Sequence, residues 1–448
     1  MNQCILMSIL TITAIIYIFI GWKTSKNINN RSDYFLSGRD LGFFSLLMTL
    51  LATQIGGGTI LGSAEEAYSK GWTVIFYPLG VSLGLILLSF GFGAKLRKLN
   101  LHTISELFEK IYESTLLRKF ASILSIVSLF FILVGMGIAT QKLFLAMGFA
   151  QKNLFFVFWT VVILYTVMGG LNAVVLTDVV QILFIIASLV LAFLFSDTSS
   201  LPLTESNTFV TDDSIPWGSW LLMPLLFMLI EQDMAQRCFA ARTPILVSLS
   251  TAFSGLILFV ICLIPIYFGL IARESGLVIP QGASVLLTTI TATTSPTISA
   301  IAASAILMAI ISTADSLLCS ISSNLSYDFP IFQTRKSSLK LAQGITFATG
   351  MLGMLTSFFF DNVVSLLILS YVLSVSVLFV PISMAVLDPK PCKRGAICSM
   401  LCGSLAFAYF KILNSTPIFG QELITLAFSM FGYWMTKLRF QKKKLNEI

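Results

Sequence analysis

Apolar runs of about twenty residues recur along this chain, and they constrain its fold more than any other feature. About twenty helical residues are needed to span the hydrocarbon core of a bilayer. We predict thirteen such spans, at 4–22, 41–63, 72–94, 119–146, 153–171, 175–196, 217–236, 246–272, 296–325, 338–360, 362–387, 395–413 and 419–436. Because 56% of the 448 residues are hydrophobic and only 11% are charged, the composition excludes an ordinary soluble globular protein. The sequence predicts an all-α, polytopic membrane protein with a single transmembrane domain over residues 1–448.

The basic residues fall mainly in connections on one side of these spans. If the amino terminus lies outside, the inner connections and the carboxyl-terminal tail hold most of the 28 Lys and Arg residues, Arg237 included, whereas one outer connection carries Asp212 and Asp213. The positive-inside rule then predicts a plasma (inner) membrane protein with its amino terminus outside and its carboxyl terminus in the cytoplasm. A basic tail at a membrane surface explains the net charge of +7, so we expect the lipid bilayer, and no nucleic acid, as a partner.

Two polar stretches interrupt the apolar pattern and have the composition of a cation site. In LLATQIGGGTILG, the three consecutive glycines Gly56–Gly58 weaken the helical backbone and free carbonyl oxygens. In MAIISTADSLLCS, the polar residues Ser312, Thr313, Asp315 and Ser316 stand where a membrane helix would prefer leucine. Polar groups inside a membrane must be satisfied, which implies a buried polar ligand. Ligands that are all oxygen favour a hard cation such as sodium.

Four segments carry a family resemblance: SDYFLSGRDLGFFSLLMTLLATQIGGGTILGSAEEAY (32–68), YTVMGGLNAVVLTDVVQ (165–181), QDMAQRCFAAR (232–242) and AIISTADSLL (309–318). In this order they resemble the sodium:solute symporters, which include the proline, pantothenate, sialic acid and sugar cotransporters. The resemblance implies a leucine-transporter-like core of two inverted five-helix repeats around a midplane site formed by discontinuous helices. This core corresponds to residues 30–387, with peripheral spans and a basic cytoplasmic tail in 1–29 and 388–448.

The resemblance also implies the ligands of a first sodium site. They are the main-chain carbonyls of Ala52, Ile55 and Ala309 and the hydroxyls of Ser312 and Thr313. Residues 309, 312 and 313 share one face of a helix, and residues 52 and 55 directly precede the glycine run. Isolated Ser and Thr residues often promote helix packing in membranes, and this is the alternative explanation.

A second sodium site, which some members of the family have, would use Ser312 again together with Asp178, Asp315 and Ser316. Asp315 adds a negative charge, which would strengthen cation binding or admit a proton. Asp178 has a second interpretation, as a structural acid near the inner mouth. We therefore leave open whether one sodium ion, two sodium ions or a proton is coupled.

The solute is expected near the helix breaks. The predicted contact residues are Gln54, Gly57, Thr59, Phe76, Tyr77, Phe227, Glu231 and Asp233, with Tyr371 as a further candidate. Glu231 stands out because a carboxylate inside a span is costly. It would recognise an ammonium group, couple a proton or pair with Arg237. Pro224 removes one backbone hydrogen bond and is expected to open the seventh span.

The sequence predicts a sodium-coupled secondary active symporter that imports a small organic solute by alternating access. A carboxylate beside aromatic rings suits an amino acid or another zwitterionic or cationic amine. The alternatives are a carboxylate or vitamin such as pantothenate as the solute, or a transporter-like sensor. A membrane enzyme is not expected, because the chain has one histidine and no clustered catalytic residues. The sequence does not predict an oligomeric state.

Overall fold

The computed structural model describes residues 3–149, 152–200, 218–329, 338–413 and 420–446, and these form a bundle of α-helices. The helices are α1 (Gln3–Ser25), α2 (Arg31–Leu36), α3 (Phe43–Gln54), α4 (Ser63–Lys70), α5 (Phe76–Leu87), α6 (Gly93–Leu99), α7 (Glu106–Tyr112), α8 (Thr115–Ala146), α9 (Lys152–Leu194), α10 (Met223–Ile230), α11 (Gln232–Ala240), α12 (Pro244–Glu274), α13 (Val285–Thr293), α14 (Pro296–Asp328), α15 (Ser338–Thr356), α16 (Val363–Ser374), α17 (Val380–Leu387), α18 (Lys393–Leu413) and α19 (Gln421–Asn446).

Each predicted span coincides with one helix or with consecutive helices of this series. By length and composition, eight helical stretches of the described residues can cross a membrane, and Phe43–Gln54 and Gly218–Ile230 are shorter apolar helices. Two stretches, Gly58–Leu99 and Lys152–Leu194, each cover parts of two predicted spans. The number of thirteen spans therefore stays a prediction. The short helix α13 was not predicted from the sequence.

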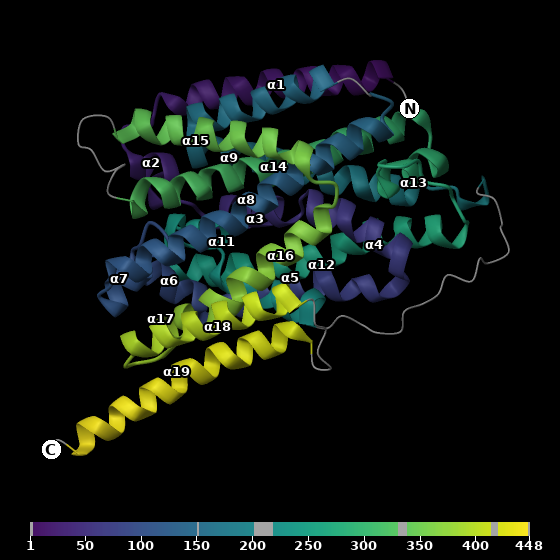
Figure 1. The fold of residues 1–448 in the computed structure, drawn as a ribbon. Helices are drawn as coiled ribbons and strands as arrows, with labels where there is room; N and C mark the ends of the chain where they lie inside the picture. Colours follow the sequence, from purple (N-terminus) through teal and green to yellow (C-terminus); the bar gives the residue numbers. More distant parts are fainter. Residues whose placement is uncertain (1–2, 150–151, 201–217, 330–337, 414–419, 447–448) are drawn as a thin grey trace.

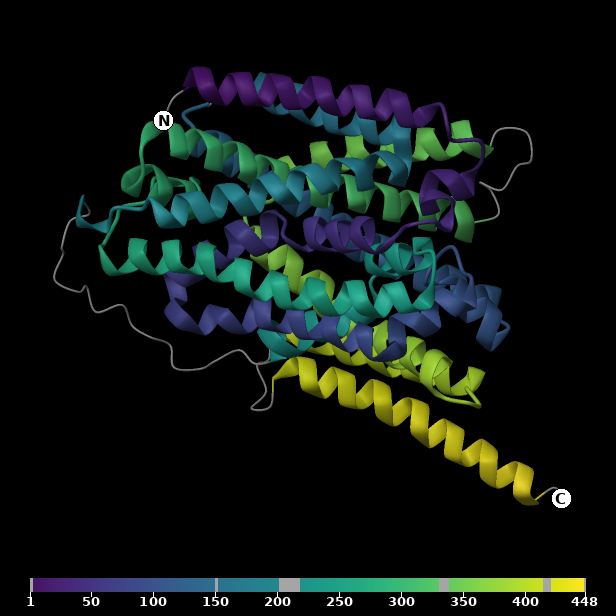
Figure 2. The ribbon, with the colours of Figure 1, turned by 180° about the vertical axis from the view of Figure 1, so that it is seen from behind.

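The helix α14 forms the centre of the bundle. It packs against α8, α9, α15 and α1, and 83% of its most apolar window is buried inside the protein, compared with 22% for α1. The helices α1 and α19 lie at opposite edges of the bundle, and α19 extends beyond the other helices towards the carboxyl terminus (Figures 1 and 2). The hydroxyl-rich segment of α14 is thus held in the interior, where it needs polar partners.

Two spans are discontinuous in the interior of the bundle. In the second predicted span, α3 ends at Gln54, and Ile55 (φ −82°, ψ 59°) is not helical. A π-helical turn over Gly58–Gly62 then leads into α4. The seventh span breaks at Glu231 (φ −68°, ψ 135°), between α10 and α11. The break at Ile55, directly before the predicted glycine run, agrees with the sequence analysis, whereas the break expected at Pro224 lies seven residues further on, at Glu231. Pro224 lies inside the helical stretch Gly218–Ile230, directly after a π-helical turn over Gly218–Leu222, so the chain stays helical there.

A third interruption divides α9 at Gly170, whose φ of 52° lies in the left-handed region. A Cβ atom at this position would lie 2.4 Å from the carbonyl oxygen of Tyr34. Glycine is therefore required both by the conformation and by the close approach of α2. The break separates the two predicted spans 153–171 and 175–196.

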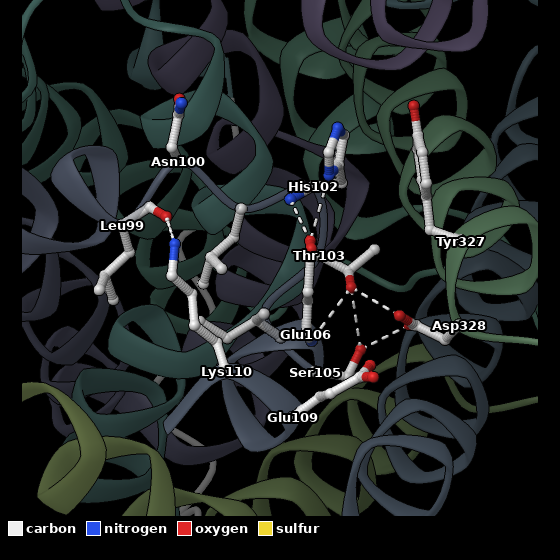
Figure 3. A network of polar contacts seen from close by, with 12 residues as sticks. Leu99, Asn100, His102, Thr103, Ser105, Glu106, Glu109, Lys110, Tyr327 and Asp328 are labelled. Carbon is white, nitrogen blue, oxygen red and sulfur yellow. Dashed lines mark hydrogen bonds and ion pairs between the residues drawn. The ribbon is translucent and has the colours of Figure 1, made fainter. Parts of the chain in front are cut away.

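A polar network closes the end of the bundle where α14 terminates. The carboxylate of Asp328 accepts hydrogen bonds from Thr103, Ser105 and Arg118, as Figure 3 shows for Thr103 and Ser105. Beside it, burial raises the pKa of Glu106, but hydrogen bonds from His102 and the charge of Arg118 outweigh this effect and lower that pKa to about 2. The lone histidine thus has a structural role in a surface network.

Candidate ion and solute site

The predicted first-site residues meet where α3 ends against α14. The hydroxyl of Ser312 lies 2.8 Å from the carbonyl oxygen of Ala52 and 3.0 Å from that of Ala309. The hydroxyl of Thr313 lies 2.9 Å from the carbonyl oxygen of Thr53 and 3.3 Å from that of Ala309. Four of the five predicted ligands are thereby brought together. Ile55 is at the break itself, but no described contact joins its carbonyl oxygen to this cluster.

These neutral oxygens fit a small hard cation. When a cation binds between these oxygens, the hydroxyls keep their protons, give up their hydrogen bonds to the carbonyl oxygens and turn their lone pairs towards the cation. Within the described residues, no three His, Cys, Asp or Glu side chains are grouped to hold a metal ion. Because the cluster consists of hydroxyl and carbonyl oxygens, it favours a hard cation such as sodium.

Gly56 makes the approach of α14 to the break possible. A Cβ atom at this position would lie 1.8 Å from the hydroxyl oxygen of Thr313. At Gly58 the nearest atom to a Cβ would be a methyl carbon of Leu367 at 2.5 Å, and at Gly57 it would be a carbon of Ile310 at 3.0 Å. The three glycines thus face three different neighbours, and only Gly56 faces the oxygen cluster.

The residues predicted for a second sodium site also lie close together. Asp178 accepts a hydrogen bond from Thr49, Asp315 accepts one from Tyr165, and Ser316 donates to the carbonyl oxygen of Ser312 at 2.7 Å. Asp178 is fully buried. It lies 3.8 Å from a guanidinium nitrogen of Arg237, so it is an interior acid rather than one at the surface.

The position of Arg237 corrects its assignment to an inner connection. The side chain is fully buried and forms its ion pair with Asp178. No ion pair in the described residues joins Arg237 to Glu231, which was one of three roles considered for Glu231. Arg237 is on the short helix α11, which is further anchored by a hydrogen bond from Gln236 to the carbonyl oxygen of Phe35 (2.7 Å) and by one from Ser320 to Gln236 (2.7 Å).

A small cavity of about 30 Å³ lies between the two helix breaks. Five predicted solute contacts line it: Gln54, Thr59, Tyr77, Glu231 and Asp233. The further candidate Tyr371 lines it as well, and its ring stacks on Tyr77 with 6.5 Å between the ring centroids. Three predicted contacts are not part of the lining. Gly57 faces α14, and Phe76 is half-buried at the start of α5. Phe227 contacts the ring of Tyr371, with 4.6 Å between the two ring centroids.

Other lining residues were not predicted as solute contacts, although Thr313 was predicted as a sodium ligand and Gly56 and Gly58 as part of the helix break. They are Thr53, Gly56, Gly58, Ile132, Met136, Thr313, Leu317 and Leu367. Leu317 is one helical turn beyond Thr313, so the periodicity of α14 contained a signal for it. Ile132 and Met136 are ordinary apolar residues of α8, and no sequence feature distinguishes them from lipid-facing ones.

Two carboxylates face the cavity from the second break. Glu231 and Asp233 are 5% and 1% exposed, and one oxygen of each has no hydrogen-bond partner among the described residues. Both acids are at the amino-terminal end of α11, where the helix dipole offsets part of the cost of a buried negative charge. A cationic partner or protonation of the acid would offset the rest of that cost.

A model of the family described as the sodium:solute symporter family matches residues 34–403. The rat high affinity choline transporter 1 is 31% identical over 208 residues, 44% of this chain and 33% of that protein. The osmoregulated proline transporter OpuE of Bacillus subtilis is 31% identical over 182 residues, 39% of this chain and 37% of that protein. The match thus spans about a third of the length of these curated relatives.

Solved structures show the same fold. A Na⁺-coupled sialic acid symporter in a substrate-bound, outward-open state has a TM-score of 0.76 and 18% identity, covering 97% of this chain and 98% of that chain. Mhp1, a nucleobase-cation-symport-1 family transporter, has a TM-score of 0.58 and 15% identity, covering 92% and 95%. These likenesses confirm the predicted fold class of an all-α, polytopic transporter.

Proposed function

Because this chain belongs to the sodium:solute symporter family, we propose that it is a sodium-coupled symporter that imports a small amine. Sodium binds the oxygen cluster of Ala52, Ala309, Ser312 and Thr313 together with the carbonyl oxygen of Ile55 at the break, and the solute binds the adjoining cavity. Alternating access around this pair of sites carries both across the membrane. The membrane potential contributes about 2.3 kcal/mol per 100 mV for each charge that moves inward.

The observation that supports the proposal is that Thr313 belongs to both the oxygen cluster and the cavity wall. Its hydroxyl belongs to the oxygen cluster, at 2.9 Å from the carbonyl oxygen of Thr53, and both residues also line the cavity. A sodium ion bound by the hydroxyl of Thr313 therefore fixes part of the solute site. This shared wall gives each ligand a preference for the same conformation, which is what coupling requires.

An amine is the solute class that the cavity supports best. Its lining includes two carboxylates and two tyrosine rings, and no Lys, Arg or His is among the described lining residues. An ammonium group would neutralise the acids and contact the electron-rich ring faces. Choline and proline, the solutes named for two relatives, both contain such a cationic nitrogen. A carboxylate or a vitamin would meet like charge here and is the less favoured alternative.

The proposed topology follows from the charge distribution. The amino terminus lies outside and the carboxyl terminus lies in the cytoplasm of a plasma (inner) membrane. Uptake of labelled amino acids, amines, carboxylates and vitamins into proteoliposomes tests the solute class, with an inward sodium gradient compared with equal sodium on both sides. Accumulation of an amine only with the gradient is expected. Sodium binding without uphill movement of any solute would favour a sensor.

We expect sodium, and not potassium, to raise the melting temperature of the purified protein. Five neutral oxygens at fixed spacing favour the smaller ion, and a ligand at 100 times its Kd stabilises the folded state by about 2.7 kcal/mol. The measurement is a melting-temperature titration in each chloride at matched ionic strength. Equal shifts in the two salts would contradict the proposed sodium site.

We expect Ser312→Ala and Thr313→Ala each to raise the sodium concentration for half-maximal stabilisation about tenfold. Each variant removes one ligand oxygen, worth about 1.5 kcal/mol, and keeps a side chain that suits a helix. Ser304→Ala is the matched control, since Ser304 is buried on the same helix and its hydroxyl donates only to the carbonyl oxygen of Ala300 at 2.9 Å. If both site variants titrate like this control, the sodium site is elsewhere.

A further inference from the structure

The helices α1 and α9 pack side by side (Figures 1 and 2), and a groove of about 270 Å³ runs between them. Met7, Leu10, Ala14 and Tyr17 line the α1 side, at spacings of three and four residues that place them on one face of the helix. Val161 is among the residues that line the α9 side. The groove is separate from the solute cavity, with which it shares no lining residue.

The groove opens on the outer surface of the bundle and ends in its interior. At the opening, Val157 is 62% exposed, whereas Phe144 of α8 and Ile311 of α14, which also line the groove, are only 3% and 5% exposed. All four helices are long and apolar enough to cross a membrane, so the opening faces the hydrocarbon of the bilayer. Ile311 directly precedes Ser312 in the sequence. The inner end of the groove therefore lies on α14 beside the oxygen cluster.

The chemistry of the groove favours a hydrocarbon. No charged side chain is among the described lining residues, and the hydroxyl of Thr11 donates to the carbonyl oxygen of Met7 at 2.8 Å within α1. The hydroxyl of Tyr17 lies beside Gln181, which does not line the groove. An empty apolar space forfeits dispersion contacts, and an apolar cavity of about 150 Å³ in a protein binds benzene. The larger groove is open to a bilayer, whose hydrocarbon consists of acyl chains.

The shape of the groove indicates a single chain. From Met7 to Tyr17 the α1 wall covers ten residue steps, or about 15 Å of helix. A volume of about 270 Å³ over this length gives a mean cross-section of about 18 Å². Non-bonded carbon atoms approach to about 4 Å, so one extended acyl chain needs a cross-section on the order of 16 Å². The fused rings of a sterol are wider than this, and the groove thus matches one acyl chain.

We propose that this groove is a lipid site that binds one acyl chain of a bilayer phospholipid. The chain enters between α1 and α9 from the leaflet on the amino-terminal side of α1, and its end reaches Phe144 and Ile311. It fills the space that α1 leaves against the interior helices and packs on α14 directly before Ser312. The site is independent of the solute and of the ion that the protein transports.

The test is photolabelling of the full chain in phosphatidylcholine vesicles that contain some phosphatidylcholine with a diazirine near the end of one acyl chain. Lipids that only surround the protein reach exposed side chains, whereas an inserted chain also reaches the buried Phe144 and Ile311. After irradiation, mass spectrometry of peptides should find label at Phe144 or Ile311 in the wild-type protein. Label confined to exposed positions such as Ile12 would overturn the proposal.

Filling the groove provides the matched comparison. Ala14→Phe places a ring in the groove and should remove most of the label at Phe144 and Ile311, with unchanged label at exposed positions. Ile12→Phe adds the same ring to the exposed face of α1, outside the groove, and should leave the buried label unchanged. If Ala14→Phe lowers the melting temperature, Val161→Phe fills the groove from α9 and is expected to give the same loss. Buried label that persists in a folded, filled variant, or that a diazirine-labelled sterol gives in place of the phospholipid, would contradict the proposed site.

Discussion

Gly56→Ala should abolish sodium-dependent stabilisation while the protein remains folded. The added Cβ atom would lie 1.8 Å from the hydroxyl oxygen of Thr313, so α14 or the broken second span must move away. Such a shift separates the hydroxyls of Ser312 and Thr313 from the carbonyl oxygens of Ala52 and Thr53. We expect at least a hundred-fold loss of sodium affinity, or about 2.7 kcal/mol, measured as the lost rise in melting temperature.

The matched control is Gly344→Ala. Gly344 is inside α15, and a Cβ atom there would meet nothing within 4 Å. Alanine favours the helix by about 1 kcal/mol over glycine, so this variant should melt at the same or a higher temperature with an unchanged sodium titration. A Gly56→Ala protein that responds to sodium like the control would show that the break at Ile55 does not form the ion site.

The sequence predicted the ion cluster better than the solute cavity, and the reason is physical. Polar groups in hydrocarbon are too costly to be placed at random, so a glycine run and a hydroxyl cluster in apolar spans mark a site directly. Ala52, Ala309, Ser312 and Thr313 accordingly lie together in the structure. Apolar cavity walls carry no such mark, because in a bilayer the residues that face lipid and those that face other helices are equally apolar.

The two incorrect expectations share a cause. Arg237 and Pro224 were interpreted from residue type alone, as a basic surface residue and as a helix breaker. The first is paired inside the bundle with Asp178, 59 positions away in the sequence, and the second lies within the helical stretch Gly218–Ile230, directly after a π-helical turn. Long-range pairing and the exact start of a helix depend on the tertiary arrangement, which residue type and hydropathy do not contain.

Glu231 differs from Asp178 and Asp328 in its partners. One oxygen of Asp178 also has no hydrogen-bond partner among the described residues, but this carboxylate forms an ion pair with Arg237 and accepts a hydrogen bond from Thr49, and both oxygens of Asp328 accept hydrogen bonds. One carboxylate oxygen of Glu231 has no partner among the described residues, although the side chain is only 5% exposed and lines the cavity. A charged group that the protein buries but does not pair is best explained by a partner that comes and goes, which is the property of a transported cation.

Glu231→Gln should therefore weaken the apparent affinity for a transported amine by about ten- to a hundred-fold, because a charge-assisted hydrogen bond contributes about 1.5–3 kcal/mol. Glutamine keeps the shape of the side chain and removes only its charge. Stabilisation by sodium should survive, since no predicted sodium ligand contacts Glu231. Uptake at varied amine concentration and the melting-temperature titration with sodium measure the two effects separately.

The control for this substitution is Glu274→Gln, which removes a carboxylate from the exposed carboxyl-terminal end of α12 and should change neither measurement. The remaining explanations of Glu231 give different results. Coupling to a proton predicts that uptake by Glu231→Gln loses its dependence on pH. Pairing with Arg237 predicts a lowered melting temperature that is rescued when both charges are removed. Unchanged amine affinity in a well-folded Glu231→Gln protein would remove this residue from the solute site, and with it the main reason for preferring an amine to a carboxylate or a vitamin.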